Sequence, residues 1–278
     1  MRIIRIRKIF IWSLICVLIL STPALATRKK KRKYTGVSCR AAVFINNSTG
    51  KRLYQKNTAR RVLPASTAKV MTALIVFEKL PLDQYVTVPI EATYTQPSKI
   101  NSRPGERYRV RDLLYAILLN SANDASVVLA QAVAGSEYKF VQLMNARAKS
   151  LGAQQTRFAN SHGLPTKIGT QYTTAYDMYL IFKQALKYDF FRDTVRMQYK
   201  TIRSFDGRLI GLRSHNKILF SKWKKKIYGK TGYTRAAQQC FVGAVESGGQ
   251  TYIISVFGCT NRWGDIRHII SRYAGIAL

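Results

Sequence analysis

Acidic residues are scarce in this chain of 278 residues, in which 13 Asp and Glu stand against 46 Lys and Arg. The resulting formal net charge of +33 at pH 7 predicts polyanionic surroundings. Nucleic acid is one class of polyanion, but the N-terminal sequence indicates export, so no nucleic-acid partner is expected. Anionic lipid headgroups or anionic cell-wall polymers fit an exported basic protein better.

Histidine and the common cofactor motifs are also poorly represented. The three histidines, His162, His215 and His268, lie far apart, and no HExxH-type zinc pair or glycine-rich phosphate loop is present. His162 lies in a loop with Gly and Pro, where a structural role is favoured. We therefore expect no metal and no cofactor.

Cysteine is limited to four residues, of which Cys16 lies in the N-terminal apolar segment. Two strand-like segments flank Gly248–Gly249 and bring Cys240 and Cys259 almost opposite each other in a predicted hairpin. In an oxidising compartment these two could form a cross-strand disulfide, with Cys39 left over. The alternative is three reduced cysteines that serve as small core residues.

The N-terminus has the features of a signal peptide. Four basic residues precede the apolar run Ile9–Leu20, and Ala24 and Ala26 have the spacing of a signal-peptidase site. Twelve residues are few for a membrane span, although an uncleaved anchor remains the alternative. Residues 1–26 are therefore predicted to be a signal peptide of a protein exported to the periplasm or the extracytoplasmic face of the membrane.

The rest of the chain is interpreted as a basic tail over residues 27–37 and one catalytic-size domain over residues 38–278. Strands are expected around residues 39–57, followed by a long block dominated by helices. Strands dominate again from about Tyr199, and a helix closes the chain. This order predicts an α+β (mixed α/β) fold, with a sheet assembled from both ends of the chain and an inserted helical subdomain.

One lysine is out of place in the helical block. Lys69 precedes the apolar segment Val70–Phe77, with no acidic residue within eight positions, and Ser66 lies one helical turn earlier. A buried ammonium without a partner has a lowered pKa, and a neutral amine can accept the proton of a serine. The alternative is a capping serine and a lysine that reaches water. Five Ser-x-x-Lys patterns occur, but only Ser66 opens a helix that is apolar nearly all round.

Two further motifs follow along the chain. Ser121 and Asn123 come directly after an apolar helix, where a polar turn is the alternative interpretation. Lys230, Thr231 and Gly232 lie in a strand-like segment, where an exposed edge strand is the alternative. The cation and hydroxyl can hold a carboxylate, and the glycine lets a substrate backbone lie along the strand.

The three motifs in this order resemble the penicillin-recognising serine enzymes. The chain is most similar to the low-molecular-mass penicillin-binding proteins that act as D-alanyl-D-alanine carboxypeptidases, including the stretches "RPGERYRVRDLLYAILLNSANDAS" and "FVQLMNARAKSLGAQQTRFANSHGLP". A departure is Gln171, where the family often has a histidine. The resemblance implies a five-stranded antiparallel sheet flanked by helices, with an inserted all-helical subdomain, as in β-lactamases and transpeptidases.

The resemblance also implies roles for the motif residues. Ser66 would attack the penultimate D-alanine of a peptidoglycan stem peptide, and Lys69 would take its proton. Ser121 would pass a proton to the leaving D-alanine, while Asn123 would orient Lys69. The substrate-binding residues would be Lys230 and Thr231 for the terminal carboxylate, Gly232, and Tyr233, whose N–H would join that of Ser66 in binding the oxyanion. β-Lactam antibiotics would be covalent inhibitors.

Three alternatives to a carboxypeptidase remain: a serine β-lactamase, a DD-endopeptidase, and a non-catalytic basic protein that binds the cell wall. The commonest lactamases need a glutamate between the second and third motifs to activate the deacylating water. The only glutamate there is Glu137, in the predicted first turn of a helix, where it is expected to face water. We therefore expect slow hydrolysis of a penicilloyl-enzyme.

Overall fold

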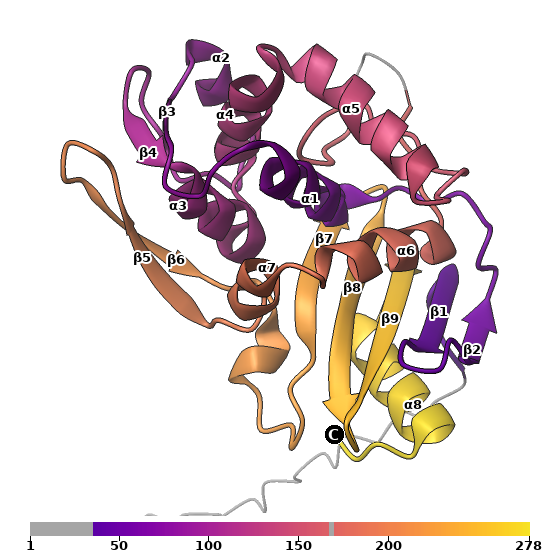
Figure 1. The fold of residues 1–278 in the computed structure, drawn as a ribbon. Coiled ribbons are helices and arrows are strands. Elements are labelled where there is room, and N and C mark those ends of the chain that lie inside the picture. The colour runs from indigo at the N-terminus through magenta and orange to yellow at the C-terminus, as the bar shows by residue number, and fades with distance from the viewer. Residues whose placement is uncertain (1–35, 167–169) are drawn as a thin grey trace, which may run out of the picture. The chain divides into compact units, whose positions relative to one another are not determined.

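A computed structural model describes residues 36–166 and 170–278, so the predicted signal peptide over residues 1–26 lies outside the described residues. Within these ranges the chain alternates strands and helices as Figure 1 shows. The strands are β1 (Ala41–Asn46), β2 (Arg52–Lys56), β3 (Tyr85–Thr87), β4 (Arg107–Arg109), β5 (Tyr199–Arg203), β6 (Leu209–Arg213), β7 (Tyr228–Thr234), β8 (Gln238–Ser247) and β9 (Gln250–Cys259). The α-helices are α1 (Lys69–Lys79), α2 (Ile90–Thr93), α3 (Val110–Tyr115), α4 (Asn123–Ala134), α5 (Glu137–Ser150), α6 (Ala175–Ala185), α7 (Asp189–Thr194) and α8 (Arg262–Ala274). The 3₁₀ turns η1 (Ala65–Ala68) and η3 (Lys217–Phe220) and the π-helical turn η2 (Ala116–Asn120) complete the elements.

The main sheet joins the two ends of the described chain. Its five strands are antiparallel and run in the order β2-β1-β9-β8-β7, so β1 pairs directly with β9. The helical block from α1 to α7 is inserted between these strands in sequence (Figure 1). The predicted five-stranded antiparallel sheet, assembled from both ends of the chain, is therefore confirmed.

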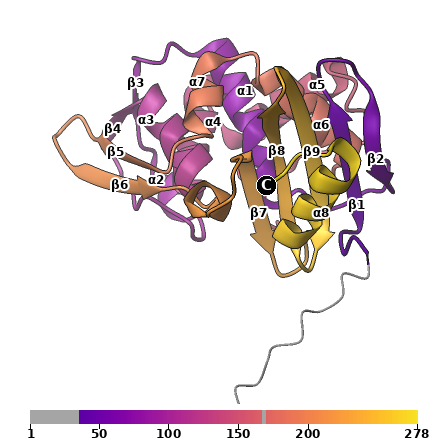
Figure 2. The ribbon, with the colours of Figure 1, turned by 90° about the horizontal axis from the view of Figure 1, so that it is seen from below.

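Helices cover both faces of this sheet, and the alternation of side chains along β1 shows how. Ala41, Val43 and Ile45 belong to the large core that includes α1 and α6, whereas Ala42 and Phe44 belong to the core under α8. Successive side chains of a strand point to opposite faces, so all six residues of β1 are buried. Figures 1 and 2 show α6 and α8 on these opposite faces.

Helix α1 is the buried centre of the helical block. All residues from Lys69 to Val76 are buried, and the helix packs against α4, α5 and α6. The predicted helix from Ser66 begins instead as the 3₁₀ turn η1 and becomes α-helical only at Lys69. A helix that is apolar all round is buried on all sides by its neighbours. Lys69 is the first residue of such a helix, so its side chain is buried with it.

The disulfide differs from both sequence-based alternatives. Cys39 is bonded to Cys259, and Cys240 is a buried free thiol. A register shift between Gln239 and Phe241 places Cys259 opposite Gln239, so Cys240 points to the large core and Cys259 to the core under α8. The predicted Cys240–Cys259 pair is therefore wrong, because the two side chains lie on opposite faces of the sheet.

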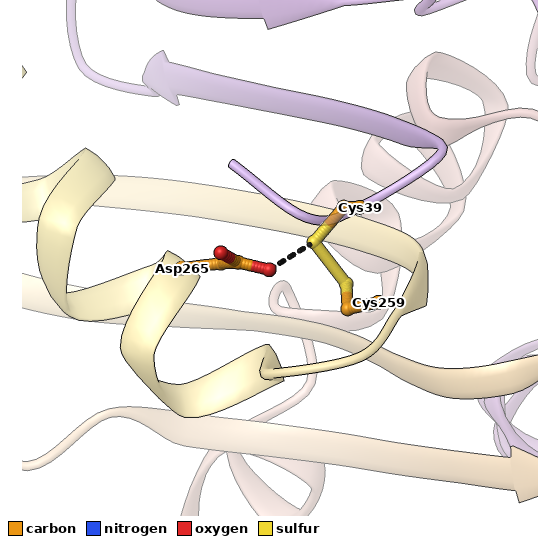
Figure 3. A group of neighbouring side chains, drawn as sticks. All are labelled: Cys39, Cys259 and Asp265. Atoms are coloured by element: carbon orange, nitrogen blue, oxygen red, sulfur yellow. Dashed lines mark hydrogen bonds between the residues drawn. A yellow bond between two sulfur atoms is a disulfide. The ribbon is translucent and has the colours of Figure 1, made fainter. Parts of the chain in front are cut away.

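The disulfide lies beside the first turn of α8. Figure 3 shows Asp265 pointing at it, with Oδ2 3.1 Å from the Cys39 sulfur. The Asp265 carboxylate also accepts hydrogen bonds from the backbone N–H and the hydroxyl of Ser38, at 3.0 and 2.5 Å. These contacts fix the start of β1 against α8.

No helix within residues 36–166 and 170–278 combines the length and the apolar character needed to cross a bilayer.

Candidate active site

Ser66 lies on the short turn η1, which is pressed between strand β7 and the loop after α5. A Cβ atom on Gly232 of β7 would lie 3.2 Å from the Ser66 backbone nitrogen, and one on Gly163 would lie 1.9 Å from the Ala65 carbonyl oxygen. Ala65 itself has a φ of 46°, in the left-handed region that non-glycine residues rarely occupy. The surrounding structure maintains such a strained backbone conformation, and strained residues of this kind are common at functional sites.

Lys69 is fully buried directly behind Ser66. Its Nζ lies 3.3 Å from the Ser66 hydroxyl oxygen and donates hydrogen bonds to Asn123 Oδ1 at 2.7 Å and to the His162 carbonyl at 2.8 Å. A neutral lysine has two N–H bonds and one lone pair. Because the two shorter contacts use both N–H bonds, the lone pair remains for the hydroxyl of Ser66.

The surroundings favour this neutral form. Burial lowers the pKa of Lys69 well below its usual value, and the nearby positive charge of Lys230 lowers it further. The carboxylate of Asp124 acts in the opposite direction but is the smallest of the three influences. Lys69 can therefore accept a proton, which a solvated lysine at neutral pH cannot.

Asn123 and Asp124, at the start of α4, fix the position of the residues on one side of the site. Asn123 accepts from Lys69 and donates to the Gln96 carbonyl at 2.7 Å, so its amide orientation is fixed from both sides. The fully buried Asp124 carboxylate accepts from the backbone N–H groups of Ile100 and Ser102, both at 3.1 Å. The sequence analysis identified Asn123 but not Asp124, which fixes the loop before β4 at the cleft.

Ser121 and Lys230 form a second serine–lysine pair. Ser121 ends the π-helical turn η2 with a φ of 60°, and Lys230 of β7 donates to its hydroxyl at 2.9 Å and to the Thr231 carbonyl at 3.0 Å. Burial and the positive charge of Arg262 lower the pKa of Lys230 to about 7. β7 is an edge strand of the sheet, yet Lys230 is buried, because η1 packs against β7 and Ser121, at the end of η2, contacts the lysine amine.

These groups open on one cleft of about 480 Å³. Six of the eight predicted site residues line it, with Lys69 and Lys230 buried behind them: Ser66, Ser121, Asn123, Thr231, Gly232 and Tyr233. Among the residues that the structure describes, no Asp or Glu lines this cleft.

Arg262, at the first position of α8, is a cleft residue that the sequence analysis missed. It donates to the carbonyls of Gly232 and Cys240 at 3.2 and 2.7 Å, and its guanidinium lies over the Trp263 ring. Burial lowers its pKa to about 10. Its only sequence signal is a basic residue beside a tryptophan, 32 positions after Lys230, and only the fold brings α8 to the end of β7.

Glu137 lies in the first turn of α5 as predicted, but its side chain is only 31% exposed and its carboxylate is hydrogen-bonded within the protein. Its Oε1 accepts from the Ser161 backbone N–H at 2.9 Å and from the Ser161 hydroxyl at 2.5 Å, and it lies 4.0 Å from His162 Nε2. Ser161 is fully buried and precedes the residue whose carbonyl binds Lys69. Glu137 therefore anchors the loop behind Lys69.

The ring of His162 is largely buried. Burial, and then the charge of Lys69, lowers its pKa to about 3, and its Nδ1 accepts from the Leu164 N–H at 3.2 Å. His162 therefore remains neutral at physiological pH and contributes its backbone carbonyl to the site.

One group of metal-ligating residue types occurs among the described residues, and it lies away from the cleft. It consists of Cys39, Cys259 and Asp265 (Figure 3). The two sulfurs are bonded to each other, so they offer no thiolate to an ion.

A serine beside a buried lysine of lowered pKa, with a second serine–lysine pair across the cleft, defines the class of serine enzymes that form acyl intermediates. A family model described as D-alanyl-D-alanine carboxypeptidase matches residues 27–261, and the chain belongs to this peptidase family.

Known proteins with similar sequences or structures agree with this assignment. D-alanyl-D-alanine carboxypeptidase DacF of Bacillus subtilis is 34% identical over 89% of this chain and 65% of its own length. A D-alanyl-D-alanine endopeptidase of Pseudomonas aeruginosa is 31% identical over 73% of this chain and 65% of its own length. The crystal structure of a Streptomyces DD-transpeptidase superposes with a TM-score of 0.79, at 28% identity, over 86% of this chain and 98% of its own. The chain thus spans slightly less than two thirds of the two sequence relatives.

Proposed function

We propose that this protein is a serine-type D-Ala-D-Ala carboxypeptidase that removes the terminal D-alanine of peptidoglycan stem peptides through an acyl-enzyme on Ser66. The observation that carries this proposal is the hydrogen bonding of Lys69. In the neutral form that its lowered pKa favours, Lys69 uses both N–H bonds for Asn123 and His162, which leaves its lone pair for the hydroxyl of Ser66.

Acylation begins with the attack of Ser66 Oγ on the carbonyl carbon of the penultimate D-alanine, while the serine proton moves to Lys69. The carbonyl oxygen becomes an oxyanion. The backbone N–H groups of Ser66 and Tyr233 receive it, which agrees with the close approach of Gly232 to the Ser66 nitrogen. One such donor stabilises the transition state by about 3–4 kcal/mol.

Collapse of this intermediate breaks the peptide bond and leaves an ester on Ser66. The departing D-alanine amine takes a proton from Ser121, and Lys230, whose Nζ donates to the Ser121 hydroxyl oxygen at 2.9 Å, returns a proton to it. Lys230 and Thr231 hold the terminal carboxylate, and Arg262 adds a second cation beside them in the same cleft. A water then attacks the ester carbonyl and loses a proton to the Ser121–Lys230 pair, while Lys69 returns its proton to the departing Ser66 oxygen, which restores the free enzyme.

Endopeptidase action is the second candidate, because one relative of comparable identity is named a D-alanyl-D-alanine endopeptidase. In a cross-linked substrate, the second stem peptide would have to occupy the part of the cleft from which the free D-alanine departs in the carboxypeptidase reaction. Lactamase activity is disfavoured, because no Asp or Glu of the described chain lines the cleft and Glu137 is occupied by Ser161. A purely structural wall-binding role leaves the buried Lys69 unexplained.

Labelled penicillin tests this proposal. The lactam should acylate the protein at Ser66, as read by peptide mapping, and the label should persist for minutes or longer. Lys69→Ala should abolish labelling, because no other described base contacts Ser66. Label at another residue, or penicillin turnover of many per second, would contradict the proposal.

The protein is further proposed to be exported and held near an anionic membrane or wall surface by the tail Arg28–Lys33. Support comes from the net charge of +33 and the signal-like N-terminal sequence. Electrostatic attachment predicts release by salt. Retention in high salt with extraction by detergent would instead indicate an uncleaved anchor.

A further inference from the structure

A second cleft, away from the active site, is lined by residues of the β5–β6 hairpin, of strands β3 and β4 and of helix α3. Figure 1 shows this hairpin beside the β3–β4 strand pair. Its volume is about 400 Å³. We call it the arginine cleft and define it by six of its lining residues: Tyr85, Arg109, Arg111, Lys200, Arg203 and Phe205.

The two walls of the arginine cleft are fixed to each other. At the tip of the β5–β6 hairpin, the Phe205 N–H donates to the Arg107 carbonyl of β4 at 2.8 Å. Arg208 donates to both carboxylate oxygens of Glu106 at 2.6 Å and to the Tyr108 hydroxyl at 2.6 Å. These bonds remove the freedom of a projecting hairpin, so the cleft is present before any ligand binds.

Positive charge in this cleft is only partly compensated. Of its four cations, Arg111 is paired with Asp83 at 2.8 Å, whereas Arg109, Lys200 and Arg203 form no ion pair with a carboxylate among the described residues. The single lining acid is Asp112. Isolated surface arginines are usually just solvated, but cations that converge on a cavity repel one another unless an anion joins them.

The details of the lining favour phosphate over a simple counter-ion. Two of the cations without a carboxylate partner, Arg109 and Arg203, are arginines, and an arginine fork matches the oxygens of a phosphate. The exposed rings of Tyr85 and Phe205 add apolar wall beside the cations. These rings can make apolar contacts with the carbon atoms that link successive phosphates in a phosphodiester polymer.

We propose that the arginine cleft binds an anionic polymer whose charges are phosphodiester groups. A flexible chain can enter a concave site and place successive phosphates against Arg109, Lys200 and Arg203. A planar bilayer would contact the rim of the cleft rather than its interior. The cleft thus provides a specific binding site for an envelope polymer, separate from the electrostatic attachment by the basic tail.

Two triple variants of the full chain test this proposal. The cleft variant carries Arg109→Gln, Lys200→Gln and Arg203→Gln. The control variant loses the same three charges at exposed lysines on other elements, through Lys51→Gln, Lys139→Gln and Lys149→Gln. The probe is a fluorescent glycerol phosphate oligomer, and affinity is measured by fluorescence polarisation across a salt series. Acylation by penicillin, measured on both variants, reports that the fold and the active site are intact.

The cleft variant should bind the oligomer about tenfold more weakly at 0.15 M salt, with a salt slope smaller by about 2. The control variant should remain within about threefold of the unmodified protein. Equal losses in the two variants would overturn the proposal, because the binding would then follow net charge alone. It would also be overturned if the cleft variant lost binding to vesicles of phosphatidylglycerol and phosphatidylcholine while binding of the oligomer was unchanged. If the cleft variant is acylated by penicillin at the wild-type rate but no longer binds the oligomer, polymer binding is independent of the peptidase site.

Discussion

Replacing Lys230 with methionine should raise the free energy of unfolding of the protein. The same substitution should remove the cation that binds the substrate carboxylate. The pKa of Lys230 is lowered from 10.5 to about 7, chiefly by burial. In the unfolded chain the amine regains its usual pKa. Because the unfolded state binds a proton that the folded state holds poorly, folding with Lys230 present costs roughly 4 kcal/mol at pH 7.

The variant also loses the hydrogen bonds from Lys230 to the Ser121 hydroxyl and the Thr231 carbonyl. Each contributes roughly 0.5–1.5 kcal/mol, so the Lys230→Met protein should gain about 1–3 kcal/mol at pH 7. A methionine of similar length fills the same space without a charge.

The pH dependence gives this prediction its sharpest test. The folded pKa lies below the unfolded one, so the unfolding free energy of the unmodified protein rises with pH between about 7 and 10.5. The variant lacks this contribution, which amounts to at most about 1.4 kcal/mol per pH unit. The advantage of the variant should therefore shrink steadily above pH 7.

Urea unfolding of both proteins at pH 7, 8 and 9, with the disulfide intact, measures the difference. A variant less stable than the unmodified protein at pH 7, with a difference that does not change with pH, would refute the reasoning. Lys230 would then be a normally charged lysine whose hydrogen bonds simply stabilise the fold.

Two other substitutions test how the site is positioned, each by the rate of acylation with a fluorescent penicillin. Glu137→Ala should slow acylation about tenfold, because Ser161 loses its acceptor, whereas Glu137→Gln should keep most of the rate through its amide oxygen. Equal rates in both variants would mean that the anchor has no effect on the base. Gly232→Ala should slow acylation by roughly 10²-fold, because the new Cβ would lie 3.2 Å from the Ser66 nitrogen. Gly211→Ala, in open space on β6, is the matched control and should react normally.

The parts of the site that the sequence could predict are those encoded by local pattern. The spacing of Ser66 and Lys69, followed by an apolar segment, indicated a buried lysine beside a serine, and the structure has Lys69 fully buried 3.3 Å from that hydroxyl. The order of strands, then a helical block, then strands likewise predicted a sheet built from both ends of the chain. The helices and strands themselves follow from patterns of residues a few positions apart, so the sequence contains them directly.

The missed features all depend on contacts between distant segments. The disulfide partner of Cys259 was mistaken because one register shift in β8 decides which face Cys240 occupies. Arg262 reaches the cleft only because α8 starts at the end of the sheet that carries β7. Glu137 was interpreted from its helix alone, whereas its partner Ser161 comes from a loop 24 residues later.

Release of D-alanine from an acyl-D-Ala-D-Ala peptide tests the central claim most directly. The purified protein and its Ser66→Ala variant would each be incubated with the peptide, and free D-alanine would be quantified over time. We expect the unmodified protein to release one D-alanine per peptide cleaved, and the variant to release none. A protein that takes penicillin on Ser66 but releases no D-alanine, or a variant that releases it at the same rate, would contradict the account.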